Sequence, residues 1–156
     1  MNENLKQMLK VSEGRHLQSG EIQVFKRYYE ALPQRLEIMR RLEEIESDCV
    51  KQALDMLFPP AMVPEMRSEL RTEVQQYTVY LYRAAATSLV QQDLLTLAKK
   101  VQFVFAILAR LGFPEGKMES AVRQMQTQVQ QVLTVNQGHL VAPYFQILSE
   151  PRLKIG

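Results

Sequence analysis

The chain has 156 residues, of which 46% are hydrophobic and 23% are charged, with a formal net charge of +2. These totals are typical of one globular domain, and the absence of a clustered basic stripe argues against nucleic-acid binding. No apolar run reaches the ~20 residues that a bilayer-spanning helix needs. The lone cysteine, Cys49, excludes an intrachain disulfide. Together with an N-terminus that lacks signal-peptide features, it favours the cytoplasm.

Apolar residues recur with a period near 3.6 along nearly the whole sequence, and this predicts an all-α fold. A short first helix is expected before Gly14, a residue suited to end it. A second helix is expected from Ser19, and Pro33 is expected to begin a third. Because the apolar stripe continues to residue 58, we also expect a bend near residues 47–48 that divides it into two consecutive helices.

The second half of the sequence continues the helical pattern after a proline-rich loop at residues 59–64. A long helix is expected over about residues 65–90, and Asp93 is expected to cap the next one. That next helix has the strongest amphipathic pattern in the chain and is expected to end at Gly112.

Pro114 is expected to begin the following helix, whose outer faces carry a run of glutamines between Gln124 and Gln131. We then predict a loop over residues 136–139 and a last short helix from Pro143. No internal repeat or long linker divides the chain. We therefore expect a single domain over residues 1–156.

No motif in the sequence predicts catalysis or metal binding. The two histidines, His16 and His139, lie far apart in predicted loops, and neither has a partner at metal-ligand spacing. Cys49 lies on the apolar stripe, where a buried, unreactive thiol is expected. We therefore expect no enzyme activity and no metal site.

Three tyrosines cluster at Tyr77, Tyr80 and Tyr82, next to Arg83. Only residues three or four positions apart share a helix face, so Tyr77 shares its face with Tyr80 and Leu81 while Tyr82 points elsewhere. The cluster fits either a pocket for a flat ligand or core packing with hydrogen-bonded hydroxyls. We favour core packing, with Tyr77 filling space rather than lining a cavity.

Five short segments stand out in order along the chain. They are Gly14-Arg15-His16-Leu17, Cys49-Val50-Lys51-Gln52-Ala53-Leu54, Tyr80-Leu81-Tyr82-Arg83, Leu111-Gly112-Phe113-Pro114 and Tyr144-Phe145. Taken together, these segments resemble those of the phycobiliprotein subunits, the globin-like proteins of the phycobilisome. The resemblance spans essentially the whole chain. It implies a globin-like core over residues 33–156 and an N-terminal helical hairpin over residues 1–32.

The chain departs from this family at the pigment site. In the family a cysteine on the long helix carries a linear tetrapyrrole, a bilin, but the matching residue here is Val74. The family's pigment-holding arginine and aspartate match Gln76 and Tyr77, and the preceding loop looks shortened. The resemblance therefore implies no covalent bilin at the usual position. Heme is also disfavoured, because the helix expected over residues 97–111 contains no histidine.

A non-covalent bilin or other tetrapyrrole is still compatible with the sequence, because a shift of one helical turn presents Arg71 and Glu73 in place of the usual pair. Our candidate pocket residues all belong to the predicted long helix. They are Arg71, Glu73, Val74, Gln76, Tyr77, Tyr80 and Arg83.

The resemblance also implies a dimer in which the hairpin of one subunit packs on the other and an acidic residue pairs with an arginine. Arg83 matches the arginine and Glu13 can replace the acidic residue, although apolar contacts are expected to dominate. The candidate interface residues are Leu5, Met8, Leu9, Glu13, Ile22, Phe25 and Arg83. We expect a homodimer or heterodimer, with phycobilisome or bilin-biosynthesis proteins as partners.

These observations lead to two functional hypotheses. The first is a non-enzymatic phycobiliprotein-like globin without covalent bilin, acting as an accessory or regulatory binding protein in a phycobilisome or bilin-biosynthesis context. The alternative is a ligandless globin-like dimerisation or sensor module in a signalling pathway.

Overall fold

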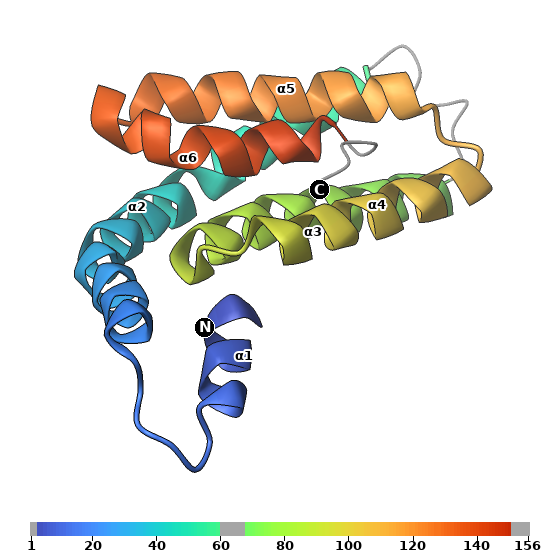
Figure 1. Cartoon of the computed structure of the whole chain (residues 1–156). Helices are drawn as coiled ribbons and strands as arrows, with labels where there is room; N and C mark the ends of the chain where they lie inside the picture. Colours follow the sequence, from blue (N-terminus) through green and yellow to red (C-terminus); the bar gives the residue numbers. More distant parts are fainter. Residues whose placement is uncertain (1–2, 60–67, 151–156) are drawn as a thin grey trace.

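The computed structural model describes residues 3–59 and 68–150, and within these ranges the chain forms six helices and no strand (Figure 1). The helices are α1 Glu3–Val11, α2 Ser19–Leu57, α3 Ser68–Gln91, α4 Leu94–Arg110, α5 Glu115–Val132 and α6 Val135–Leu148. The prediction of an all-α fold is confirmed.

Helices α2 to α6 pack around one hydrophobic core. Helix α2 packs against both α3 and α5, and α6 contacts α3, α4 and α5. Figure 1 shows α5 and α6 lying side by side above the pair formed by α3 and α4. Each of these helices turns its apolar stripe inward, and burial of apolar surface stabilises the packing by about 25 cal/mol per Å². The core draws its residues from all five helices.

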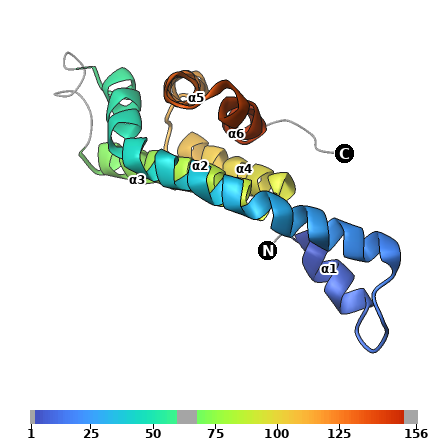
Figure 2. The same ribbon diagram turned by 90° about the vertical axis from the view of Figure 1, so that its left-hand side faces the viewer.

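Helix α2 is a single helix of 39 residues that contains Pro33 in its interior. The predictions of a helix start at Pro33 and of two separate helices divided near residues 47–48 are therefore wrong. Figure 2 does show the last turns of α2 bent away from the rest of the helix. A proline inside a helix costs about 3 kcal/mol because it removes one hydrogen bond and crowds the preceding turn. Buried residues on both sides of it, Tyr28 and Ile38, anchor the two halves and offset this cost.

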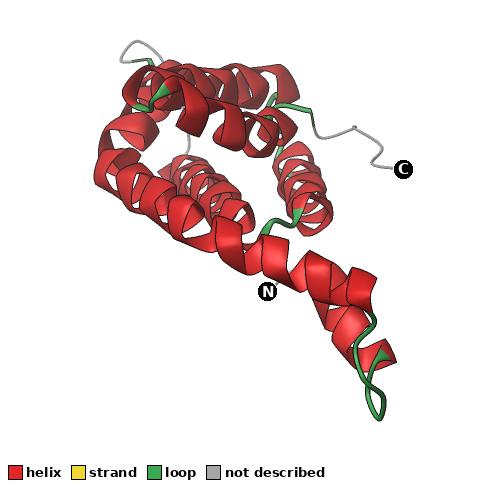
Figure 3. Ribbon diagram, turned by 60° about the vertical axis from the view of Figure 1, so that its left-hand side comes forward, coloured by secondary structure: helices red, strands yellow, loops and turns green. Residues whose placement is uncertain are grey.

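The N-terminal hairpin consists of α1 and the first part of α2, and it projects from the other helices (Figures 1, 2 and 3). Gly14 turns the chain with a φ of +84°, as the sequence predicts. Glu21 then fixes the start of α2, because its carboxylate accepts hydrogen bonds from the Gln18 backbone N–H at 2.8 Å and from Arg15 at 2.6 Å. Gln18, not the predicted Ser19, is the cap residue.

Asp93 connects the hairpin to the core. Its carboxylate caps α4, as predicted, by accepting the Thr96 backbone N–H at 3.0 Å. It also accepts the Glu3 backbone N–H at 3.2 Å, so the first turn of α1 rests on the junction between α3 and α4. Burial opposes ionisation of Asp93, but the hydrogen bonds from Thr96 and Glu3 hold the pKa of this carboxyl below its ordinary value.

The turn between α4 and α5 matches the prediction. Gly112 has a φ of +76°, and the Phe113 N–H donates back to the Leu108 carbonyl at 2.9 Å while the Phe113 side chain is buried. Pro114 immediately precedes α5. These contacts close the end of α4 in the way that a left-handed glycine allows.

The end of the described chain differs from the prediction. Residues 136–139, expected to be a loop, belong to α6, which begins at Val135 and contains Pro143. The Thr134 hydroxyl starts this helix by accepting the Gln137 N–H at 3.3 Å. Gly138 is a packing residue, because its carbonyl accepts from the Gln130 side chain at 2.9 Å and an added Cβ would collide with that side chain.

Two further sequence expectations concern the proline-rich loop and membrane-spanning helices. The predicted loop at residues 59–64 and the first residues of the predicted long helix, 65–67, lie outside the described residues, apart from Pro59. Among the residues that are described, no helix is both long and apolar enough to traverse a lipid bilayer.

Candidate functional site

The pocket candidates on α3 do not converge on one cavity. Val74 is fully buried in the core, Glu73 and Tyr77 are half-buried, and Arg71 and Gln76 are exposed. A helix turns each successive side chain by about 100°, so residues this close in sequence separate onto different faces. The predicted face of Tyr77, Tyr80 and Leu81 lies across the boundary between the core and the surface. Tyr80 is 41% exposed, whereas Leu81 is buried.

Tyr82 is the tyrosine of this cluster that enters the core. Its hydroxyl donates to the Leu42 carbonyl of α2 at 2.6 Å, and its ring packs edge-on to Phe145 of α6 with centroids 5.6 Å apart. Burial raises the pKa of the Tyr82 hydroxyl well above its ordinary value. Core packing with a hydrogen-bonded hydroxyl is therefore confirmed for Tyr82. Tyr77 packs against the core from its edge.

Arg83 is exposed on the outer surface of α3 and borders three neighbouring surface hollows. Its guanidinium pairs with the Glu46 carboxylate of α2, with Nε–Oε1 and Nη2–Oε2 distances of 2.6 and 3.2 Å. This paired geometry raises the pKa of Arg83 above its ordinary value. The intrachain pair between α2 and α3 was not anticipated, since the sequence pattern had suggested only an intermolecular partner for Arg83.

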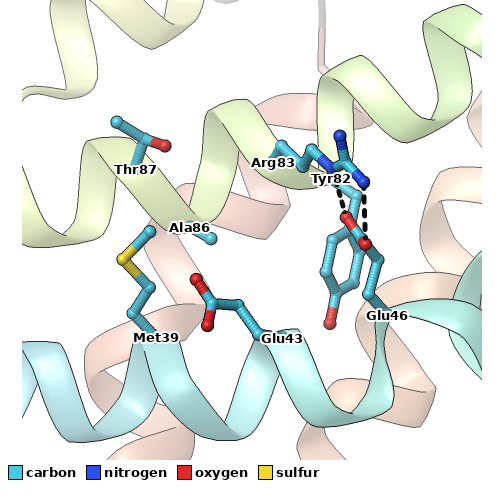
Figure 4. Close-up of a pocket in the computed structure, with 7 residues that line it drawn as sticks. All are labelled: Met39, Glu43, Glu46, Tyr82, Arg83, Ala86 and Thr87. Atoms are coloured by element: carbon cyan, nitrogen blue, oxygen red, sulfur yellow. Dashed lines mark hydrogen bonds and ion pairs between the residues drawn. The ribbon is translucent and has the colours of Figure 1, made fainter.

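One of the three hollows, which we call the α2–α3 cleft, lies between the middle turns of these helices (Figure 4). It has a volume of about 350 Å³. Its lining residues are Met39, Glu43, Glu46, Tyr82, Arg83, Ala86 and Thr87. The cleft thus combines apolar walls with two carboxylates and one guanidinium.

A second hollow, of about 340 Å³, lies between α3 and α4 and brings together three of the predicted pocket residues, Gln76, Tyr80 and Arg83. Lys100 of α4 lines the same hollow and is its second cation. Arg71, Glu73, Val74 and Tyr77 do not line it. The sequence offered no signal for Lys100, because its place opposite α3 depends on how the two helices pack.

The residues of the chain do not fit covalent bilin attachment. A thioether needs an accessible cysteine whose thiolate can attack the pigment. Cys49 is completely buried in α2, and burial raises the pKa of its thiol to about 11. Val74, the residue that the sequence resemblance predicted at the attachment position, is also fully buried.

Six of the seven predicted interface residues lie on the projecting hairpin, whereas Arg83 lies on α3, and not all of the six reach the hairpin's surface. Leu9 and Ile22 are exposed, Met8 and Phe25 are half-buried, and Glu13 is exposed beyond the end of α1. Leu5 is only 1% exposed, because it packs within the chain.

The hairpin also exposes apolar side chains that the sequence analysis did not single out. Val11 is 70% exposed, and Val24 and Tyr29 also face solvent. Helical periodicity does not tell which apolar residues of the hairpin the chain covers and which it leaves exposed, so it did not identify these three as exposed. We use the term hairpin surface for the exposed residues Leu9, Val11, Ile22, Val24 and Tyr29.

Among the described residues, no group of three or more His, Cys, Asp or Glu side chains has a geometry that could hold a metal ion. His16 lies in the loop before α2, as expected, whereas His139 lies on α6 and not in a loop. Five surface ion pairs among the described residues join side chains that are three to six positions apart in the sequence.

Comparison with known proteins agrees with this architecture. The sequence of residues 11–150 matches the family model described as phycobilisome protein. No curated protein matches the chain. The matched region covers nearly all of the described helices, including the second half of the hairpin, the α2–α3 cleft and α6. The chain belongs to the phycobilisome protein family.

Proposed function

We propose that this protein is a non-enzymatic member of its family that carries no covalent bilin and acts by binding another protein. Its context is the phycobilisome or bilin biosynthesis, where it serves as an accessory or regulatory subunit in the cytoplasm. The family supplies the context, and the buried state of Cys49 supports the absence of a thioether-linked pigment. A free, buried thiol also fits a reducing compartment.

The hairpin surface is the observation that carries this proposal. Five large apolar side chains are exposed on α1 and the adjoining turns of α2, a segment that projects from the core. Exposed apolar patches on soluble proteins commonly mark protein interaction sites. The docking partner we propose is a second globin-like chain, either another copy of this protein or a related family member.

Size-exclusion chromatography with light scattering tests this proposal. The wild-type chain is expected to elute as a dimer or to form a complex with a purified phycobilisome subunit, and the Leu9→Asp/Val11→Asp variant is expected to lose this association. Both residues are exposed, so the variant keeps the folded core. Leu5→Asp is unsuitable, because Leu5 is buried and its replacement would disturb the hairpin itself.

The matched control is Leu95→Asp, which places the same charge at an exposed leucine of α4, outside the hairpin. Association that persists in the hairpin variant, or that is lost equally in the control, would contradict docking through the hairpin surface.

We further propose that any tetrapyrrole binds non-covalently, in the hollow between α3 and α4. Lys100 supplies positive charge for a propionate group there, and Tyr80 supplies an aromatic side wall, while Arg83 is already paired with Glu46. Adding biliverdin to the purified protein should shift and sharpen its absorbance, and Lys100→Ala should weaken the change. A spectrum identical to that of free biliverdin, with no co-elution, removes this part of the proposal.

The alternative function is a ligandless dimerisation or sensor module. It is favoured by the filled core around Val74, the residue that the resemblance matches to the family's attachment cysteine. Val74 and its neighbours Thr78 and Leu81 are all fully buried. This alternative predicts that the chain associates through the hairpin surface and that biliverdin leaves its spectrum unchanged.

A further inference from the structure

We propose that the α2–α3 cleft receives the Lys10 side chain of a second copy of this chain, with the Lys10 ammonium group paired to the Glu43 carboxylate. The inference rests on the proposed docking through the hairpin. It adds the identity of the partner, the residue that enters the cleft and the register in which the two copies meet.

The charge left over in the cleft is negative. Its one guanidinium, that of Arg83, is already paired with Glu46 through two short contacts. Glu43 lies one turn before Glu46 on α2, and its carboxylate points into the same cleft (Figure 4). Glu43 makes no ion pair or side-chain hydrogen bond with any other described residue. A cation is therefore the complementary occupant.

The shape of the cleft suits a lysine side chain. Met39 and Ala86 form apolar walls, and the Thr87 hydroxyl lies at the rim. A lysine buries its four methylene groups along apolar surface and keeps its ammonium group near a charged or polar partner. The volume of about 350 Å³ accommodates such a side chain without displacing the Arg83–Glu46 pair.

The hairpin carries a cation that fits this role. The other cations of α1 and the following loop are paired within the chain, Lys6 with Glu3 at 2.9 Å and Arg15 with Glu21 at 2.6 Å. Lys10 is exposed and pairs with no described carboxylate. It lies between Leu9 and Val11, two members of the hairpin surface, so a partner that covers these residues also meets Lys10.

The two surfaces carry matching charge patterns. On the hairpin, Lys10 is followed three residues later by Glu13. On the receiving surface, Glu43 is followed three residues later by Glu46, which holds Arg83. One register therefore brings Lys10 to Glu43, where opposite charges meet, and brings Glu13 towards Arg83, whose guanidinium Glu13 and Glu46 then share. In a two-fold symmetric dimer the arrangement occurs twice.

Sedimentation analysis of the full chain over a concentration series tests the proposal, using Glu43→Lys, Lys10→Glu and the double variant. Each single reversal should raise the dimer dissociation constant by about tenfold or more, since like charges then face one another at two equivalent sites. The double variant should recover to within about threefold of the wild type, because opposite charges meet again. Raising the salt concentration should weaken the wild-type dimer.

The matched control is Glu44→Lys, which reverses the neighbouring exposed carboxylate on α2. Glu44 pairs with Arg40 at 2.6 Å and does not line the cleft. This control should leave the dissociation constant near the wild-type value. Far-UV circular dichroism of all variants checks that helix content is retained.

Several outcomes overturn the assignment. A dissociation constant unchanged in Glu43→Lys, or no recovery in the double variant, removes Lys10 from the cleft. Arg27 is the other hairpin cation without a described partner. If adding Arg27→Glu to Glu43→Lys restores the wild-type dissociation constant, Arg27 and not Lys10 occupies the cleft. A monomeric wild type overturns the second copy as occupant. If Leu9→Asp/Val11→Asp loses the dimer and Glu43→Lys keeps it, docking through the hairpin stands. In that case only the proposal that Lys10 enters the cleft is refuted.

Discussion

The core and the N-terminal hairpin are both built from amphipathic helices, but they differ in how far their apolar side chains are buried. In the core, α2 to α6 turn their stripes towards one another, and residues such as Leu81 and Leu97 lose all contact with water. In the hairpin, Leu5 and Tyr28 are covered, but the hairpin surface is not. Burial therefore marks the folded core in one region, and in the other we propose that the exposed apolar residues mark a site of association.

The sharpest test of this contrast is a pair of leucine truncations. Leu81→Ala in the core is expected to reduce the free energy of unfolding by about 2–5 kcal/mol, through lost burial and the cavity left behind. Leu9→Ala on the hairpin surface is expected to change it by less than about 0.5 kcal/mol, because Leu9 is 43% exposed. Urea unfolding of both variants measures the difference. Equal losses in the free energy of unfolding would contradict the proposed difference between the core and the hairpin surface.

Pro33 lies where α2 passes from the hairpin to the core, so Pro33→Ala examines how firmly the two are joined. Alanine restores a hydrogen bond to the Tyr29 carbonyl and relieves the crowding of the proline ring, and it should stabilise the chain by up to about 3 kcal/mol. Thermal unfolding should show the gain. A loss of stability would mean that the core depends on the local geometry that the proline imposes.

Tyr82→Phe separates the hydrogen bond from the ring in the core. The variant keeps the edge-on contact with Phe145 but leaves the buried Leu42 carbonyl without the tyrosine hydroxyl, a donor at 2.6 Å. We expect a loss of about 1–2 kcal/mol in the free energy of unfolding. Tyr80→Phe, at an exposed position, is the control and should be close to neutral. Equal effects of the two would argue against a specific role for the buried hydroxyl.

The smallest expected effect is the pH dependence of stability that Glu21 contributes to the hairpin. Hydrogen bonds from Arg15 and from the Gln18 backbone lower the pKa of Glu21 from its ordinary value of 4.5 to about 2. Because the folded pKa is the lower one, the stabilisation is present above about pH 4.5 and is lost as the pH falls towards 2. The stability difference between wild type and Glu21→Gln should shrink over this window. A difference independent of pH would contradict a role for the carboxylate charge.

Much of the fold could be predicted from local signals. The turns at Gly14 and Gly112 and the cap at Asp93 follow from backbone geometry that few residues adopt, so the sequence identifies them directly. Pro33, Pro143 and Gly138 misled the prediction because their local preferences are outweighed by packing. Gly138 is selected by contact with Gln130 of another helix, which no local pattern reveals.

The candidate site was less predictable. Arg83 was identified from its sequence context, but Glu46 and Glu43 were not, since they come from a helix 37 or more residues away in the chain. Of the residues predicted to form an interface, Leu9 and Ile22 are exposed, whereas Leu5 is buried by the chain itself. Exposure depends on three-dimensional packing, and the sequence gives it only indirectly.

The unbroken length of α2 has a mechanical consequence. At 1.5 Å per residue, its 39 residues have a contour length of about 58 Å, and Figure 2 shows its last turns bent away from the rest. Its first turns belong to the hairpin, and its later turns form one wall of the α2–α3 cleft. If a partner docks on the hairpin, we therefore expect a tilt of the hairpin to move the α2 wall of the cleft. A hinge at Pro33 would have insulated these regions from each other, and the continuous helix couples them.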